Sequence, residues 1–503
     1  MKTRLCIGLA LMMCGSLVAE LQEVRVGGEI RIRGRHFGNS LNPGSAREGR
    51  LPGGGRDIPG RPLGPHGVSS IYDVDRARED FTFVEQRTLL NISADFTDQV
   101  STFLELESWG RWGEQNANGN EFRSDYVTGV DNRAWTGDDV EIFQAYIQAE
   151  EMFGYPVRLR LGRQELAMGD SWLVGSRVSP TLGISYDAIR ATWTPGDFTI
   201  DAWWAKLNET FGDFASDDVD FYGVYSTYAG WEPLSVSPFF LLIHDGRDIA
   251  SPAGTTQDFD STWLKTAGIR AFGAQSGFDY DLHLAYQWGT ADSAGSLYVQ
   301  PFSGLAASDA DYDAWAGDLE FGYTFDTNWH PRVYVGGAYF SGDDNRDVSW
   351  AEAIDRNHVP DASLAFNRLF SGWWYTANTD IIGGASAMTN FHQVRAGVTV
   401  QPLEKISVGL ATQYLGVNDP FDWPDGPNVW NTREADDELG YVAHLWVKYD
   451  YSDDLWIRIG WERFFSQDGL QDGSYILQHG HDLLAGTDDD PMDYIYFDTQ
   501  LKF

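Results

Sequence analysis

Basic residues recur on the polar side of extended stretches in which polar and apolar residues alternate. The set is Arg31, Arg33, Arg158, Arg160, Arg190, Arg395, Arg458 and Lys502. A guanidinium group binds a carboxylate through paired donors and stays charged at neutral pH. Several such groups along a narrow passage would raise the local concentration of anions. These residues are therefore candidate pore-lining contacts for a small anionic solute or a saccharide.

Acidic residues occupy the same polar side of these stretches. They are Glu29, Glu105, Glu107, Asp201, Asp281, Asp318, Glu320, Glu462 and Asp498. Opposite charges on neighbouring strands pair with one another, and such pairs would neutralise part of the basic set. Three interpretations therefore stay open: selection of anions, a mixed polar wall without selectivity, and a preference for cations.

Patterns that would indicate catalysis or a cofactor are weak. The HGH run at His479–His481 lacks the ligand spacing of a metal site. The glycines at 53–55 are not followed by the Gly-Lys-Ser/Thr of a phosphate-binding loop. No nucleophile elbow occurs, and both cysteines, Cys6 and Cys14, lie near the N-terminus. We expect no catalytic residues, no bound metal and no cofactor.

The last ten residues, 494–503, show the alternation most clearly. One side carries Ile495, Phe497, Thr499, Leu501 and Phe503, and the other side is more polar. A period of two is the geometry of a β-strand whose two faces meet different surroundings. A last strand that ends on an apolar aromatic residue resembles the insertion signal of bacterial outer-membrane β-barrels. It predicts the barrel-assembly machinery as a partner.

Gaps between the extended stretches alternate between short and long. Short ones include 97–99, 195–197 and 452–454, and long ones include 343–388 and 466–490. This rhythm predicts an all-β fold, a transmembrane antiparallel barrel of about 18 strands with short periplasmic turns and long extracellular loops.

Membrane-facing character is visible within a single stretch. Phe278–Trp288 has aromatic rings at both ends of one face and leucines between them, while its other face is polar. At about 3.3 Å per residue and a tilt of about 40°, such a strand spans roughly 25 Å, the height of a barrel's apolar band.

The N-terminus and the composition agree with export to a membrane. Residues 1–19 have the basic start, apolar run and small final residue of a signal peptide, which leaves 20–503 as the barrel. Removing Lys2 and Arg4 would change the formal net charge from −38 to −40. So acidic a chain is a poor partner for nucleic acid.

Several segments resemble the alginate-export family of outer-membrane proteins. They are FQAYIQAEEMFGYPVRLRLGRQELAMGD at 143–170, and the stretches at 186–193, 338–345, 366–375 and 438–464. The resemblance implies an 18-stranded porin-like barrel in the outer membrane of a Gram-negative-type bacterium. It also implies an arginine-rich lumen that selects an anionic polysaccharide.

Two classes of function follow. The first is a non-enzymatic channel for passive passage of saccharides or small anionic solutes, including export of an anionic exopolysaccharide such as alginate. The second is a barrel enzyme or an adhesin that uses the long loops as its working surface. In either case outer-membrane lipid and lipopolysaccharide would surround the chain.

The gap at 343–386 is too long for a plain connection and rich in aromatic residues, so we expect it to fold into or over the pore mouth.

Overall fold

The computed structural model describes most of the chain after residue 20. The described residues are 21–38, 81–97, 99–112, 140–176, 183–209, 218–246, 261–292, 309–342, 363–376, 389–419, 423–424, 432–433, 436–467 and 491–503. The segment predicted to be a signal peptide lies outside them. No helix among these residues is long and apolar enough to cross a membrane.

Long strands of 8 to 17 residues make up most of the described chain. They are β1 (Glu23–Gly38), β3 (Phe81–Thr97), β4 (Val100–Arg111), β5 (Glu141–Ala149), β6 (Val157–Gln164), β7 (Tyr186–Trp193), β8 (Phe198–Asn208), β9 (Val219–Trp231), β10 (Leu234–Asp245), β11 (Thr262–Gln275), β12 (Phe278–Asp292), β13 (Asp309–Thr324), β14 (Arg332–Phe340), β16 (Phe391–Leu403), β17 (Ile406–Val417), β20 (Glu438–Asp450), β21 (Leu455–Ser466) and β22 (Met492–Lys502). Shorter elements are η2 (Met152–Gly154), β15 (Ser363–Leu364), β18 (Trp423–Pro424) and β19 (Thr432–Arg433).

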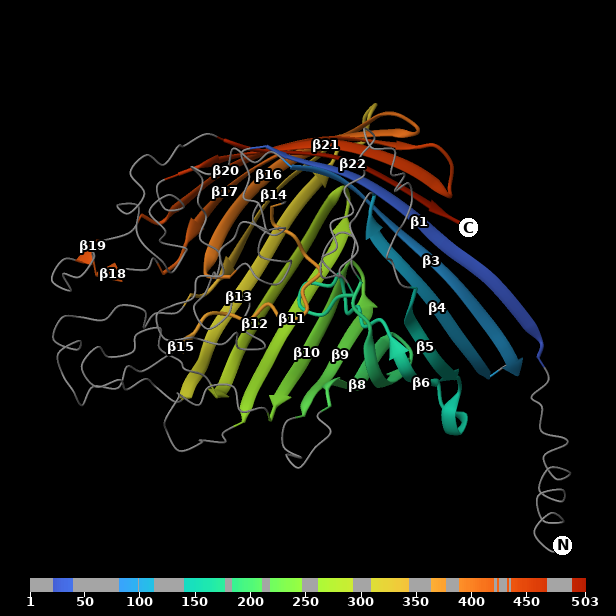
Figure 1. The fold of residues 1–503 in the computed structure, drawn as a ribbon. Coiled ribbons are helices and arrows are strands. Elements are labelled where there is room, and N and C mark those ends of the chain that lie inside the picture. The colour runs from blue at the N-terminus through green and yellow to red at the C-terminus, as the bar shows by residue number, and fades with distance from the viewer. Residues whose placement is uncertain are drawn as a thin grey trace, which may run out of the picture.

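These long strands close into one barrel, as Figure 1 shows. Each pairs antiparallel with its neighbours along the chain, and β1 closes the ring by pairing with β22 as well as β3. The predicted antiparallel barrel of about 18 strands is confirmed, since 18 strands form the closed ring. Closure leaves no free edge along the sheet, which is the condition for β-structure in lipid.

The two ends of the barrel differ in how the strands are joined. At one end very short turns join β3 to β4, β11 to β12 and β16 to β17. The first strand, β1, begins at this end, and the last strand, β22, finishes there. At the other end the sequence gaps are long, for example between β14 and β16. We call these the short-turn end and the long-loop end. The sorting of gap lengths predicted from the sequence is therefore confirmed.

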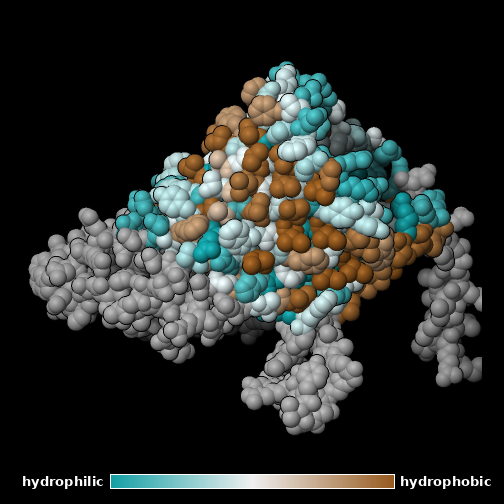
Figure 2. All heavy atoms as spheres, turned by 90° about the horizontal axis from the view of Figure 1, so that it is seen from above, coloured by the Kyte–Doolittle hydropathy of each residue, from teal (hydrophilic) through white to brown (hydrophobic). Residues whose placement is uncertain are grey.

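The outer face of the wall is apolar, whereas the inner face carries polar and charged side chains as well as apolar ones. On β12, Phe278, Leu284 and Tyr286 point outward and are 62%, 46% and 47% exposed, while His283 and Gln287 point inward and are buried. Figure 2 shows one outer face, where apolar side chains gather in the middle and polar ones toward the margins. The C-terminal Phe503 is also exposed and continues the outward set of β22.

Candidate functional site

Two segments from outside the 18 long strands lie within the lumen. We call residues 165–176, which follow β6, the first insert, and residues 363–376, which precede β16, the second insert. They pair with each other through backbone bonds such as Phe370 N to Leu173 O (3.0 Å) and Gly372 N to Ser171 O (2.9 Å). The indole of Trp172 also donates to the Tyr375 hydroxyl at 3.2 Å. The inserts therefore form one unit across the barrel interior.

The inserts bury their apolar side chains against the inner wall. Phe366, Trp172 and Tyr375 belong to one buried cluster with Phe340 on β14 and Phe391 on β16. The ring centroids of Phe340 and Phe366 are 5.7 Å apart, and those of Phe340 and Phe391 are 4.9 Å apart. The prediction that 343–386 folds into or over the pore mouth is confirmed for its described part, 363–376, which lies inside the lumen. Its influence on conductance stays a prediction.

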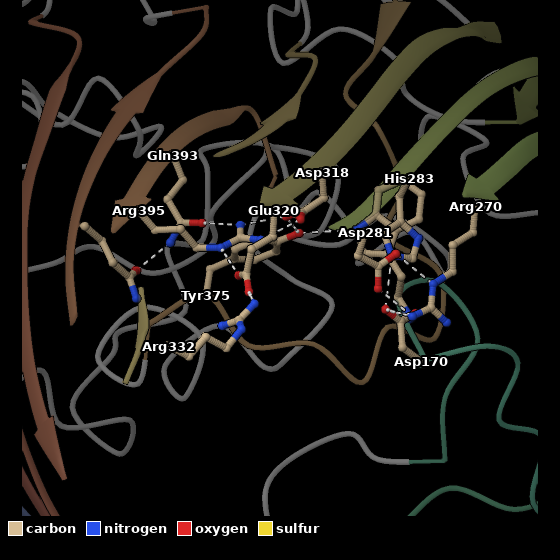
Figure 3. A network of polar contacts seen from close by, with 12 residues as sticks. Asp170, Arg270, Asp281, His283, Asp318, Glu320, Arg332, Tyr375, Gln393 and Arg395 are labelled. Carbon is tan, nitrogen blue, oxygen red and sulfur yellow. Dashed lines mark hydrogen bonds and ion pairs between the residues drawn. The ribbon is translucent and has the colours of Figure 1, made fainter. Parts of the chain in front are cut away.

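A buried polar network fixes the second insert to β13 and β16 (Figure 3). The Tyr375 hydroxyl donates to Asp318 Oδ2 at 3.1 Å. Arg395 donates to both oxygens of the same carboxylate at 2.9 and 2.7 Å, and to Glu320 Oε2 at 3.1 Å. Burial raises the pKa of the Tyr375 phenol well above its ordinary value, so the group remains a donor. Asp318 is 2% exposed and the Arg395 side chain 11%, which makes this a largely desolvated ion pair.

Several predicted basic residues lie together because the ring closes. Arg33 on β1 stands opposite Asp498 on β22, which stands opposite Arg458 on β21. Arg31 lies on the same face of β1 and pairs with Glu29 at 2.9 Å. Arg33 lies 3.7 Å from Asp498. Closure of the ring therefore places Arg31, Arg33 and Arg458 in one sector of the wall.

Two further buried arginines of this sector are not among the predicted pore-lining residues. Arg35 contacts Asp498 at 2.6 Å and Glu85 at 3.6 Å, and Arg87 on β3 contacts Glu107 at 2.6 Å. Arg35 continues the alternation of Arg31 and Arg33, so the signal for it was present. Arg87 becomes apparent only from the pairing of β1 with β3, which sets it opposite Arg31.

Most of the other predicted cations are matched by an acid on a neighbouring strand or turn. Arg158 lies 2.6 Å from Glu150, and Arg190 lies 2.8 Å from Asp201. Arg395 lies 2.7 Å from Asp318. For these residues the interpretation of a mutually neutralised polar wall fits the structure.

Three cations of the set have no acidic partner within ion-pair distance among the described residues. Arg160 donates to the neutral Gln148 Oε1 at 2.7 Å and lies over the Tyr146 ring at 4.2 Å. Arg458 lies over the Trp446 ring at 4.7 Å, and Lys502 is exposed. Arg160 and Arg458 are half-buried. All three stand in the half of the lumen toward the short-turn end, where they leave uncompensated positive charge.

Close to the first insert, the lumen also holds a cluster that the sequence did not reveal. Asp170 of the insert approaches Asp281 and His283 of β12, with Arg270 of β11 beside them (Figure 3). The inward position of Asp281 and His283 followed from alternation on β12. The approach of Asp170, more than a hundred residues earlier in the chain, did not.

A closed barrel with an apolar exterior, a charged lumen and loops folded inside it is the architecture of a porin-like channel protein. The chain belongs to the alginate export family, whose model matches residues 73–467. The resemblance noted in the sequence is therefore confirmed. A comparison with curated protein sequences gives no match.

Solved structures of outer-membrane Occ/OprD porins are similar in fold. Pseudomonas aeruginosa OccK8 (OprE) is 9% identical with a TM-score of 0.52, and the match covers 96% of this chain and 98% of that one. Acinetobacter baumannii OccAB1 is 13% identical with a TM-score of 0.51, covering 95% and 97%. Pseudomonas aeruginosa OprD is 10% identical with a TM-score of 0.50, covering 96% and 97%. At these identities the likeness establishes the fold alone.

Proposed function

We propose that the protein is an outer-membrane channel for passive passage of saccharides and small anionic solutes. The observation that carries this proposal is the uncompensated charge of Arg160 and Arg458 on the inner wall. Ion pairs cancel at a distance, whereas a charged group without an opposite partner keeps its full field. Among the buried and half-buried lumen residues that the structure describes, this holds for Arg160 and Arg458 and, with the opposite sign, for Glu105, which accepts from the neutral Asn91 and Gln144. The two arginines outweigh this one carboxylate. In a passage with low-dielectric walls that field favours anions, despite the acidic balance of the whole chain.

A polyuronate is the substrate class that fits this wall best, and export of an anionic polysaccharide such as alginate is the form that family membership supports. Each sugar of such a polymer carries a carboxylate, and guanidinium groups bind carboxylates with two donors at once. Arg160 and Arg458 are each the fourth residue of a strand that begins at the short-turn end, so a chain passing along the lumen would meet both near that end. We assign no catalytic role to any residue.

The placement in the membrane follows from the same features. The apolar outer face would contact lipid, and the long-loop end would face lipopolysaccharide outside the cell. The short-turn end would face the periplasm, which puts Arg160, Arg458 and Lys502 in the periplasmic half of the lumen. The barrel-assembly machinery would recognise the last strand, with its exposed Phe503, during insertion.

Solute flux into liposomes tests the proposal directly. Liposomes that contain the refolded full chain are expected to admit glucuronate faster than glucose and glucose faster than glucosamine, because the wall attracts anions and repels cations. Protein-free liposomes and liposomes with a heat-denatured sample are the controls. Swelling that matches the protein-free liposomes for every solute would contradict a channel function. If glucosamine enters fastest and glucuronate slowest, the channel function stands and only the anion preference is contradicted.

A further inference from the structure

Three side chains with metal-binding atoms meet where the first insert touches the wall. His283 Nε2 lies 3.0 Å from Asp170 Oδ2 and 3.2 Å from Asp281 Oδ1. One ligand atom from each residue lies within 4.8 Å of the other two. Asp281 and His283 come from β12, whereas Asp170 comes from the insert, so the cluster joins a loop to the barrel (Figure 3).

Two of these donor atoms are buried and make no hydrogen bond of acceptable geometry, although they lie only 3.0 Å from each other. His283 is 2% exposed. Its Nε2 and Asp170 Oδ2 both lack a partner of acceptable hydrogen-bond geometry among the described residues. Buried polar atoms in folded proteins almost always find protein, water or an ion. A buried imidazole nitrogen aimed at two carboxylates is therefore an observation that points to a ligand.

Neighbouring groups hold each of the three side chains in place. The imidazole lies against Trp172 and Trp373, with ring centroids 4.8 and 5.5 Å away. Asp281 accepts two bonds from Arg270, at 2.8 and 2.5 Å. Asp170 Oδ1 accepts the Trp172 backbone N–H at 3.3 Å, which leaves Oδ2 for another partner. Ligands oriented by a second layer of contacts are characteristic of protein metal sites.

We propose that Asp170, Asp281 and His283 bind one divalent transition-metal ion of the Zn²⁺ type. With bonds of about 2.0–2.2 Å and tetrahedral angles, neighbouring ligands of such an ion stand about 3.3–3.6 Å apart. The distances from His283 Nε2 to the two carboxylates, 3.0 and 3.2 Å, are slightly shorter, so a small outward shift of the ligands admits the ion. A cavity of about 20 Å³ lined by Asp170, Trp172 and His283 adjoins the cluster. That volume accommodates one water, which would complete a four-coordinate site.

Charge and ligand type define which ions fit. Two carboxylates attract a dication, although Arg270 already offsets one of their two charges. The imidazole favours zinc, nickel or iron over calcium and magnesium. Arg270 is the internal competitor, because its Nη2 lies 3.4 Å from Asp170 Oδ2 and would give up that contact. Asp318, opposite His283 on β13, is already engaged by Arg395 and Tyr375. A bound ion would fasten the first insert to β12.

Calorimetric titration of the EDTA-treated, refolded full chain with Zn²⁺ tests the site. We expect one saturable site that is weakened about tenfold or more by Asp170→Asn and by His283→Gln. Ca²⁺ should not compete with Zn²⁺ for this site, whereas it would compete for carboxylates in acidic loops. His330→Gln, which removes an exposed histidine in a turn, is the matched control and should bind like the parent chain.

Co²⁺ provides a second readout through its visible absorption, which an imidazole–carboxylate site would change and a surface carboxylate would not. Asp170 lies outside the strands, so Asp170→Asn should preserve the folded barrel, and gel mobility before and after heating checks that it does. Absence of saturable Zn²⁺ binding would overturn the proposal. So would a site that both variants retain at the parent affinity, or one that Ca²⁺ occupies equally well.

Discussion

Replacing residues 363–376 with a Gly/Ser linker of equal length should raise the single-channel conductance several-fold. In the native protein this segment packs Phe366 and Tyr375 into the buried cluster of the lumen and bonds to the first insert. A Gly/Ser chain has neither the aromatic volume nor the hydrogen-bonding side chains to stay there, and it behaves as a flexible coil. The lumen would therefore widen where the insert now lies. Planar-bilayer recording of single channels is the measurement.

The control is a replacement of similar chemistry away from the lumen. Changing the turn Met152–Gly154 to Gly-Ser-Gly should leave the conductance unchanged, because none of its residues is buried. If the 363–376 replacement folds, as judged by heat-dependent gel mobility, and still conducts like the parent chain, the second insert does not limit the pore.

Asp318→Asn should lower the free energy of unfolding by about 3–5 kcal/mol, because it leaves the largely buried Arg395 guanidinium facing a neutral amide. The lost carboxylate accepts from Arg395 at 2.7 and 2.9 Å and from Tyr375 at 3.1 Å. Glu320 still contacts Arg395 at 3.1 Å, which keeps the effect toward the lower end of that range. Urea unfolding of the barrel in lipid vesicles measures it.

Asp95→Asn is the matched control for that substitution. Asp95 also pairs with an arginine, Arg25, at 2.7 Å, but the Arg25 side chain is 60% exposed. Exposed pairs contribute about 0–1 kcal/mol, so the same chemical change should scarcely shift the urea midpoint. Equal effects of the two substitutions would show that burial of the Asp318–Arg395 pair adds nothing to stability.

The barrel was predictable because its signal is local. Alternation on β12 and β22 and the lengths of the gaps do not depend on distant contacts, and closure then brings β1 beside β22. The inserts were only partly predictable. Aromatic residues showed that 366–375 would not stay in water, but the bond between Trp172 and Tyr375 joins positions 203 residues apart. Nothing in either local sequence specifies that partner.

Neutralisation of the arginines was beyond sequence reasoning for the same reason. Arg158 and Arg160 occupy equivalent positions in the alternation of β6, yet only Arg158 is reached by Glu150 at the end of the preceding strand. Arg160 meets the neutral Gln148 instead. Strand register and turn geometry decide which of these two arginines meets a carboxylate and which keeps an unneutralised charge, and both are properties of the folded barrel.

Reversal potential under a KCl gradient tests the central claim, that uncompensated arginines set the preference of the pore. The parent chain should be anion-selective, and Arg160→Gln with Arg458→Gln should move the reversal potential toward zero or to the cation-selective side. The control is Arg163→Gln. Arg163 lies on β6 like Arg160 but pairs with Asp187 at 2.9 Å on the outer face, so its replacement should leave the reversal potential unchanged. A cation-selective parent chain, or a double variant with the parent reversal potential, would contradict the account.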